Sequence, residues 1–159
     1  MREEKLFKLE QVIFDVDGVF TNGQFLYNKD GKQYKIFGAH DADGIRMLLE
    51  KEIAVSAISA DKRGFPITKK RMDDIGITVT LVSENDRIEY FKNCGDLSKT
   101  CFMGDGHYDA KIFNIVTYSI APSNAVDVAK KSASFVTNLP GGNGAVYEAC
   151  VHLLGKMEN

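Results

Sequence analysis

Several features that mark secreted or membrane proteins are missing from this 159-residue chain. No stretch approaches the roughly 18 consecutive apolar residues of a membrane-spanning helix, and the charged start MREEKLFKLEQ lacks the apolar segment of a secretory signal. The three cysteines, Cys94, Cys101 and Cys150, are odd in number and lack metal-ligand spacing, which favours reduced thiols over a zinc site. We therefore expect a soluble, cytoplasmic protein with no membrane partner.

A strong net charge is also missing. The 20 basic and 22 acidic residues leave a formal charge of −2, so no overall basic field exists for nucleic acid and we expect no nucleic-acid partner. The chain has no linker or repeat, and 44% of its residues are hydrophobic, enough for one core. We expect a single domain over residues 1–159.

Short β-rich apolar segments alternate with segments of helical periodicity, which is typical of a parallel sheet covered by helices. The predicted strands are 11–16, 53–60, 77–83, 100–105, 116–121 and 134–138, and the predicted helices are 41–52, 65–76, 85–94, 107–114, 123–131 and 144–154. Asp41 is the expected N-cap of the first helix, and Gly76 the stop signal of the second. The pattern predicts a doubly wound, Rossmann-like α/β fold with helices on both faces of the sheet.

Residues 18–38 interrupt this alternation. Lys29, Asp30 and Gly31 form a turn signal between two apolar segments, GQFLYN and QYKIFG, so we expect a β-hairpin inserted directly after the first strand. Its many apolar side chains need a partner surface, because a free two-stranded ribbon is only marginally stable. That surface is either another subunit or the chain's own sheet.

Polar residues follow the ends of the predicted strands. Asp15 and Asp17 end the first, Ser59 ends the second, Arg87 lies just beyond the third, and Asp105 and Asp109 follow the fourth in GDGHYD. Carboxyl ends of parallel strands meet at one edge of a sheet. Carboxylates gathered there would repel one another unless a cation neutralised them, and an all-oxygen set suits Mg²⁺.

These segments resemble a known family. DVDGVFTNG resembles the first motif of haloacid-dehalogenase-type phosphatases, and GDGHYD, about 90 residues later, resembles their fourth. Four further features resemble those of the small capless 3-deoxy-octulosonate 8-phosphate phosphatases and their nonulosonate 9-phosphate relatives. They are the hairpin, the lack of a cap domain, and the segments DADGIRMLLEKEI and LPGGNGAVYEA. The resemblance covers about residues 10–155.

The resemblance implies a role for each motif residue. Asp15 would be the nucleophile that forms an aspartyl-phosphate, and Asp17 the acid and base. Mg²⁺ would be held by Asp15, Asp105 and the backbone carbonyl of Asp17, with Asp109 in support. Phosphate would be bound by Ser59, Ala60, Gly18 and a third-motif cation, for which Arg87 is the first candidate and Lys92 the alternative.

The sequence departs from this family at positions that would face the substrate. Asn143 and Tyr147 stand where two arginines are usual, which puts octulosonate 8-phosphate itself in doubt. Lys62 and Arg63, near the end of the second strand, could restore positive potential, and His40 is a further candidate substrate contact. The exact sugar acid and the breadth of specificity stay open.

The resemblance also implies a homotetramer in which hairpins meet and neighbouring subunits help to close each site. The expected function is hydrolysis of a small sugar-acid phosphate. The alternative is a non-catalytic oligomerisation or regulatory domain linked to sialic-acid-type sugar activation, which would not need the full set of Asp15, Asp17, Asp105 and Asp109. A phosphoacceptor signalling domain is disfavoured, because Asp17 would speed the turnover that a signal must avoid.

Overall fold

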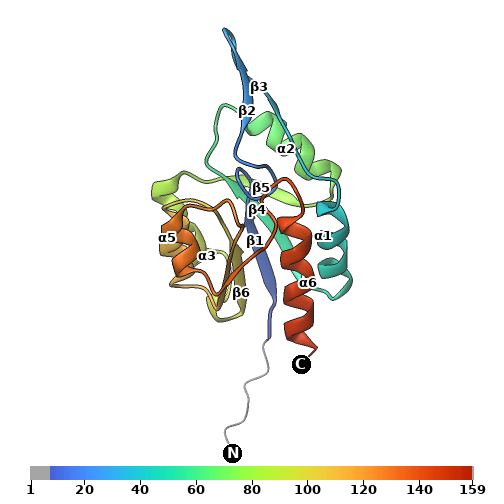
Figure 1. The fold of residues 1–159 in the computed structure, drawn as a ribbon. Coiled ribbons are helices and arrows are strands. Elements are labelled where there is room, and N and C mark those ends of the chain that lie inside the picture. Colours follow the sequence, from blue (N-terminus) through green and yellow to red (C-terminus); the bar gives the residue numbers. More distant parts are fainter. Residues whose placement is uncertain (1–7, 159) are drawn as a thin grey trace, which may run out of the picture.

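A computed structural model describes residues 8–158 and shows one parallel sheet of six strands (Figure 1). The strands follow the order β5-β4-β1-β6-β7-β8, which is the doubly wound order of the Rossmann fold. Their bounds are β1 (Gln11–Asp15), β4 (Ala54–Ser59), β5 (Thr78–Leu81), β6 (Thr100–Met103), β7 (Tyr118–Ala121) and β8 (Phe135–Val136). The predicted fold class is confirmed, and each strand lies inside its predicted segment.

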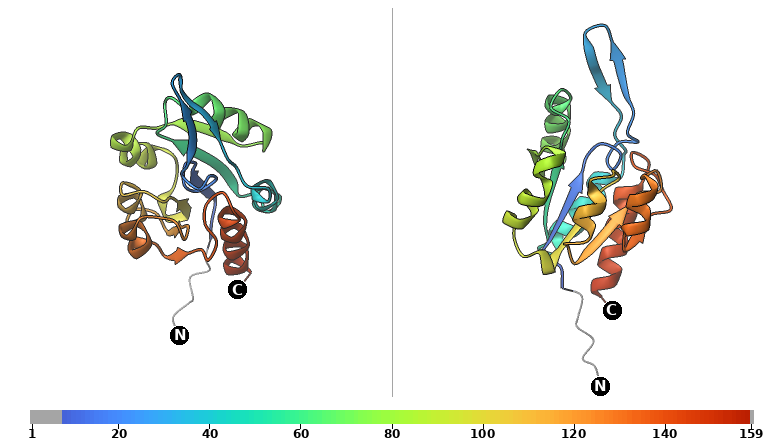
Figure 2. Two further views of the ribbon diagram at one scale, coloured as in Figure 1. Left: turned by 45° about the horizontal axis from the view of Figure 1, so that its top comes forward. Right: turned by 90° about the vertical axis from the view of Figure 1, so that its left-hand side faces the viewer.

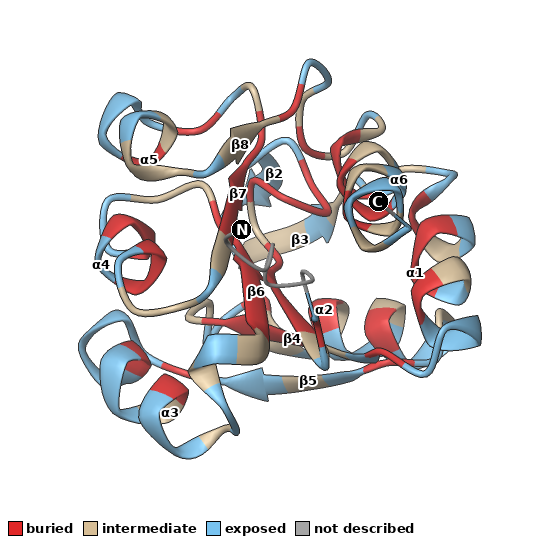
Figure 3. Ribbon diagram, turned by 90° about the horizontal axis from the view of Figure 1, so that it is seen from below, coloured by how far each residue is buried: buried red, intermediate tan, exposed pale blue. Residues whose placement is uncertain are grey.

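Helices cover both faces of this sheet (Figure 2). One face carries α1 (Asp41–Glu50), α2 (Phe65–Asp74) and α6 (Ala145–Met157), and the other carries α3 (Arg87–Asn93), α4 (Asp109–Phe113) and α5 (Asp127–Ser132). Two short 3₁₀ turns, η1 (Glu84–Asp86) and η2 (Leu97–Lys99), precede α3 and β6. Buried residues concentrate on the strands and on the inward faces of the helices (Figure 3).

Strand β1 lies in the middle of the sheet and fixes the site. It pairs in parallel with β4 on one side and β6 on the other. Val12 and Phe14 pack into the core beneath α1 and α6, whereas Ile13 packs into the core beneath α3 and α4. Such burial on both faces explains the continuous apolar sequence, and the chain order reverses between β1 and β6, where such sheets form their binding crevice.

The start of α1 differs from the prediction. Asp41 is the first helical residue rather than the N-cap, which is His40, and no side chain caps the helix. The Asp41 carboxyl is buried instead, its Oδ2 atom has no hydrogen-bond partner, and burial raises its pKa to about 6 against the opposing charges of Arg71 and His40. Tertiary packing therefore overrides the local capping preference. The stop at Gly76 is confirmed, with a left-handed φ of 82°.

The hairpin consists of β2 (Phe25–Asn28) and β3 (Gly31–Lys35) and projects beyond the carboxyl edge of the sheet (Figures 1 and 2). Its apolar side chains are 46–66% exposed: Phe25, Leu26, Tyr27, Tyr34 and Ile36. The alternative expectation, that this apolar face packs over the chain's own sheet, is therefore wrong. Phe37, just after β3, does pack against the core and anchors the base of the hairpin.

No helix within residues 8–158 is long and apolar enough to cross a bilayer. Residues 1–7, on which the prediction of a missing secretory signal partly rests, lie outside the described residues.

Candidate active site

A cleft of about 430 Å³ opens at the carboxyl edge of the sheet, beside the base of the hairpin. It brings together most of the predicted site residues with several that were not predicted. Its lining comprises Asp15, Asp17, Gly23, Phe25, Lys32, Ala60, Asp61, Glu84, Arg87, Asp105, Gly106, Tyr108 and Asp109. Six of these residues are acidic and two are basic, so the net negative charge of the cleft favours binding of a cation.

Asp15, at the end of β1, is only 6% exposed. Its Oδ1 accepts a hydrogen bond from the backbone N–H of Val16 at 2.9 Å and another from Nη2 of Arg87 at 3.2 Å. Burial and the neighbouring charges of Asp109 and Asp105 raise its pKa well above the ordinary value, while Arg87 opposes this shift. The carboxylate is thus held by two donors in a site that favours a further positive charge.

Arg87, the first residue of α3, bridges two of the acids. Its guanidinium contacts Asp15 and makes a short ion pair with Asp109, and the residue is only 4% exposed. Lys92, the other third-motif candidate, is exposed on α3 and is not among the residues that line the cleft. The structure therefore brings Arg87, and not Lys92, to the predicted nucleophile.

Asp109, the first residue of α4, has both carboxylate oxygens engaged by the protein. Oδ1 pairs with Arg87, and Oδ2 accepts from the N–H groups of Asp105 at 3.0 Å and Gly106 at 2.8 Å. A Cβ at Gly104 would lie 2.5 Å from the Asp109 carboxyl carbon, so the close approach requires glycine there. Asp109 thereby joins Arg87 to the loop that carries Asp105, and its supporting role stays a prediction.

The side chain of Asp105, in that loop, has no hydrogen-bond partner among the described residues other than its own backbone N–H. One oxygen each from Asp15, Asp105 and Asp109 lie within 4.8 Å of one another. Burial, followed by repulsion from Asp109, raises the pKa of Asp105 to about 7. Gly18 makes room for this carboxylate, because a Cβ there would lie 1.8 Å from Asp105 Oδ2.

The loop after β1 is shaped by Thr21. Its Oγ1 accepts hydrogen bonds from the N–H groups of Gly18 and Gly23, both at 3.1 Å, and both glycines have positive φ, at 84° and 87°. Residues with a side chain adopt such angles only at a cost in free energy, so the backbone conformation of this loop favours glycine at both positions.

Asp17 points toward the hairpin. Its Oδ1 lies 2.7 Å from Nζ of Lys35, which also reaches Oδ2 of Asp61 at 2.8 Å. Lys32 pairs with the same Asp61 oxygen and lies over the ring of Phe25, 4.0 Å from its centroid. Sequence reasoning missed Lys32, Lys35 and Asp61. The available signal is the pair of lysines three residues apart in the predicted hairpin, beside its apolar residues.

The remaining predicted residues divide into two groups. Ala60 lines the cleft, and buried Ser59 lies directly before it, with its Oγ accepting the N–H of Asp61 at 3.2 Å. Lys62 and Arg63 are exposed and do not line the cleft. His40 lies in a separate depression with Tyr147, the ring centroids 6.2 Å apart. Contacts of His40, Lys62 and Arg63 with a substrate stay predictions.

A parallel sheet in the doubly wound order, with three aspartates at its switch point, is compatible with several classes of protein. The family model described as haloacid dehalogenase-like hydrolase matches residues 88–149 and identifies the class. The 3-deoxy-D-manno-octulosonate 8-phosphate phosphatase of Haemophilus influenzae is 33% identical over 154 residues, covering 92% of this chain and 83% of that protein. The chain therefore belongs to the family of 3-deoxy-D-manno-octulosonate 8-phosphate phosphatases. The predicted resemblance, and the prediction of a phosphatase of the haloacid dehalogenase class, are confirmed.

Solved structures of this family agree in fold. The cobalt-bound H. influenzae phosphatase has a TM-score of 0.85 at 31% identity, and the match covers 98% of this chain and 92% of that one. The Moraxella catarrhalis phosphatase, solved in complex with magnesium, phosphate and 3-deoxy-D-manno-octulosonate (KDO), has a TM-score of 0.86 at 25% identity, with coverage of 98% and 91%.

Proposed function

We propose that this protein is a magnesium-dependent phosphatase that hydrolyses a small sugar-acid phosphate, of the 3-deoxy-ulosonate 8-phosphate or nonulosonate 9-phosphate type, through an aspartyl-phosphate on Asp15. The observation that carries the proposal is the buried Asp15 carboxylate, clamped by Arg87 beside Asp105 and Asp109. The H. influenzae relative, named as an octulosonate 8-phosphate phosphatase, supports the substrate class.

The residues present fit a divalent cation. Among residues 8–158 the Asp105 carboxylate accepts a hydrogen bond only from its own backbone N–H, and the pKa of both Asp15 and Asp105 is raised by burial and by neighbouring carboxylates. An all-oxygen set of this kind suits Mg²⁺. Asp15, Asp105 and the Asp17 carbonyl would hold the ion, whereas both oxygens of Asp109 are already engaged. When bound, Mg²⁺ would supply charge neutralisation for the phosphate oxygens.

The chain's own residues account for the two chemical steps. An Asp15 oxygen attacks phosphorus, the bond from phosphorus to the sugar oxygen breaks, and Asp17 gives that oxygen a proton. Water then attacks the phosphorus of the aspartyl-phosphate, Asp17 accepts its proton, and inorganic phosphate leaves as Asp15 is restored. Arg87 would pair with the phosphoryl oxygens while keeping Asp15 in place, and the backbone around Gly18 and Ala60, with the Ser59 hydroxyl, would complete the phosphate site.

We further propose that the protein works as a cytoplasmic homotetramer. The free thiols of Cys94, Cys101 and Cys150 favour a reducing compartment. The exposed apolar face of the hairpin favours assembly. Assembly would also serve recognition, because the two cations that line the cleft, Lys32 and Arg87, are already paired with carboxylates of the same subunit. The cation that binds a substrate carboxylate would then come from a neighbouring subunit.

Phosphate release from octulosonate 8-phosphate, nonulosonate 9-phosphates and simple sugar phosphates, with and without Mg²⁺, tests the activity. We expect Mg²⁺-dependent release that is lost in Asp15→Asn and kept in Asp127→Asn, a matched change at an exposed aspartate of α5. No release from any of these esters by a folded, assembled protein would refute the proposal and favour a non-catalytic oligomerisation domain. Light scattering of Ile36→Lys tests the assembly, and a mass unchanged from the wild type would argue against hairpin contacts.

A further inference from the structure

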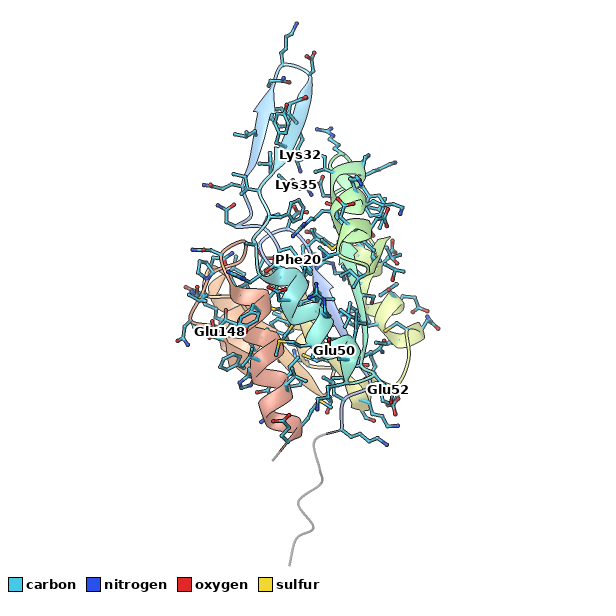
Figure 4. All side chains as sticks on the ribbon, turned by 90° about the vertical axis from the view of Figure 1, so that its right-hand side faces the viewer. Phe20, Lys32, Lys35, Glu50, Glu52 and Glu148 are labelled. Carbon is cyan, nitrogen blue, oxygen red and sulfur yellow. The ribbon has the colours of Figure 1, made fainter. Side chains whose placement is uncertain are left out.

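Lys35 is the most completely satisfied cation near the cleft. Its ammonium group reaches Asp17 Oδ1 at 2.7 Å, Asp61 Oδ2 at 2.8 Å and Thr68 Oγ1 at 2.9 Å. An ammonium group has three N–H donors, so all three are used. The side chain is only 1% exposed. Figure 4 shows Lys35 and Lys32 between the hairpin and α2.

The charges of this cluster balance. Two lysines, Lys32 and Lys35, face two carboxylates, Asp17 and Asp61. Burial alone would raise the pKa of Asp61, but hydrogen bonds from Lys32, from Lys35 and from the N–H of Gly64 outweigh it and lower that pKa to about 2. Asp61 is therefore ionised at neutral pH and, with Thr68, holds the Lys35 ammonium in one place. The bond to Asp17 thus comes from a fixed donor.

Asp17 needs such a donor. Its side chain is 34% exposed, and within residues 8–158 its Oδ2 atom has no protein partner. A carboxylate free to rotate about its side-chain bonds would present its oxygens to the substrate only part of the time, and small displacements of a reacting group cost large factors in rate. With Oδ1 bound to Lys35, the free Oδ2 is left to meet the substrate oxygen.

We propose that Lys35 is a positioning residue that holds the Asp17 carboxylate in place for proton transfer, so that this step depends on how the hairpin is seated. This inference rests on the proposed function of Asp17. Lys35 does not line the cleft and acts through Asp17. Since Lys35 ends β3 and lies between the exposed Tyr34 and Ile36, a contact that moves the hairpin also moves the group that orients the acid.

The test compares two substrates that differ in their need for an acid. Octulosonate 8-phosphate has an alkoxide leaving group that must be protonated, whereas p-nitrophenyl phosphate releases a phenolate that needs no proton. For Lys35→Met we expect kcat/KM, which covers only the steps up to phosphoryl transfer to Asp15, to fall by about tenfold to a hundredfold on the sugar phosphate, within the range of general acid catalysis, and by less than about threefold on the phenyl ester. Lys35→Arg, which keeps the charge, should recover part of the loss.

Lys29→Met is the matched control, because Lys29 is exposed in the turn of the same hairpin and does not line the cleft. It should leave the ratio of the two kcat/KM values at the wild-type level. In an Asp17→Asn background, Lys35→Met should add less than about a twofold loss, since two residues that act as one unit are not additive. Should Lys35→Met fail to fold, Lys35→Gln and Lys35→Arg give the same comparison.

Equal losses on both substrates, or an additive loss in the Asp17→Asn background, would overturn the role of Lys35. A wild-type protein that releases phosphate from neither ester would refute the proposed function itself. An active wild type whose kcat/KM ratio for the two substrates is unchanged in Lys35→Met would refute only the positioning role.

Discussion

Replacing Gly18 by alanine tests whether the site depends on the position of Asp105. The new Cβ would lie 1.8 Å from Asp105 Oδ2, whereas ordinary van der Waals contact begins at 3.4 Å, so the carboxylate would have to retreat by about 1.6 Å. Misplacement of a reacting or ligating group by about 1 Å can cost about a hundredfold in rate. We expect Gly18→Ala to lower kcat by at least about a hundredfold and to weaken Mg²⁺ binding.

Backbone strain is a separate effect in the same variant. Gly18 has a φ of 84°, and alanine in this left-handed region costs about 1–2 kcal/mol. Gly23 provides the control, because its φ is 87° but its Cβ would meet nothing closer than the Gly18 Cα at 3.8 Å. Gly23→Ala should therefore lose similar stability but far less activity.

The assay combines three measurements on both variants. Thermal unfolding gives the cost of the strain, calorimetric titration gives the affinity for Mg²⁺, and phosphate release gives kcat. If Gly18→Ala bound Mg²⁺ and turned over substrate as well as Gly23→Ala does, Asp105 would not act from the place in which the structure shows it.

Three further predictions concern buried charge. Arg87→Met should destabilise the metal-free protein by about 3–5 kcal/mol, because it leaves the buried Asp15 and Asp109 without their cation. Urea unfolding measures the loss, and Arg87→Lys, which keeps the charge, should lose less. The pKa of Asp105 is about 7 in the folded protein and 3.8 in the reference state, so between these pH values the folded state binds a proton that the unfolded state has lost. The contribution of this residue to stability should therefore be lost as pH rises from about 4 to about 7. Asp105→Asn should remove that loss, and a wild-type protein with the same pH dependence as the variant would contradict the assignment. The pKa of Asp41 is also raised, to about 6, so its contribution to the free energy of unfolding should fall as pH rises from about 4 to about 6. Asp41→Asn should therefore gain more stability, relative to the wild type, at pH 8 than at pH 5 in denaturant titrations.

The central part of the site could be predicted from the sequence because it follows strand ends. A continuous apolar segment predicts β1, and the parallel arrangement then brings the residues after β1 and β6 together. This reasoning predicts Asp15 and Asp105 at one edge of the sheet, and it predicts Arg87 from its place after the third predicted strand. Each of these predictions needs only the order of the strands and the chain position of one residue.

The lysine contacts and the buried Asp41 could not be found in this way. The bond from Lys35 to Asp17 depends on the angle at which the hairpin leaves the sheet, and no periodicity of the sequence encodes that angle. Asp41 has the residue type of an N-cap, but its carboxyl packs inside, near the bare backbone of Gly38, where a Cβ would lie 3.4 Å from its Oδ2. In both cases the three-dimensional packing decides the contact: Lys35 meets Asp17 from the hairpin, and Arg71 of α2 lies near the Asp41 carboxyl.

The glycines around the cleft have an evolutionary consequence. Added side-chain atoms at Gly18 and Gly104 would occupy the space of the carboxyl groups of Asp105 and Asp109, and at Gly141 would meet the backbone oxygen of Gly18 at 2.1 Å. Substitution at these positions displaces the acids without removing any of them. Random mutagenesis of this gene should therefore yield inactive variants at glycine codons as well as at aspartate codons, and a descendant that kept every acid of the cleft could still have lost its chemistry through one methyl group.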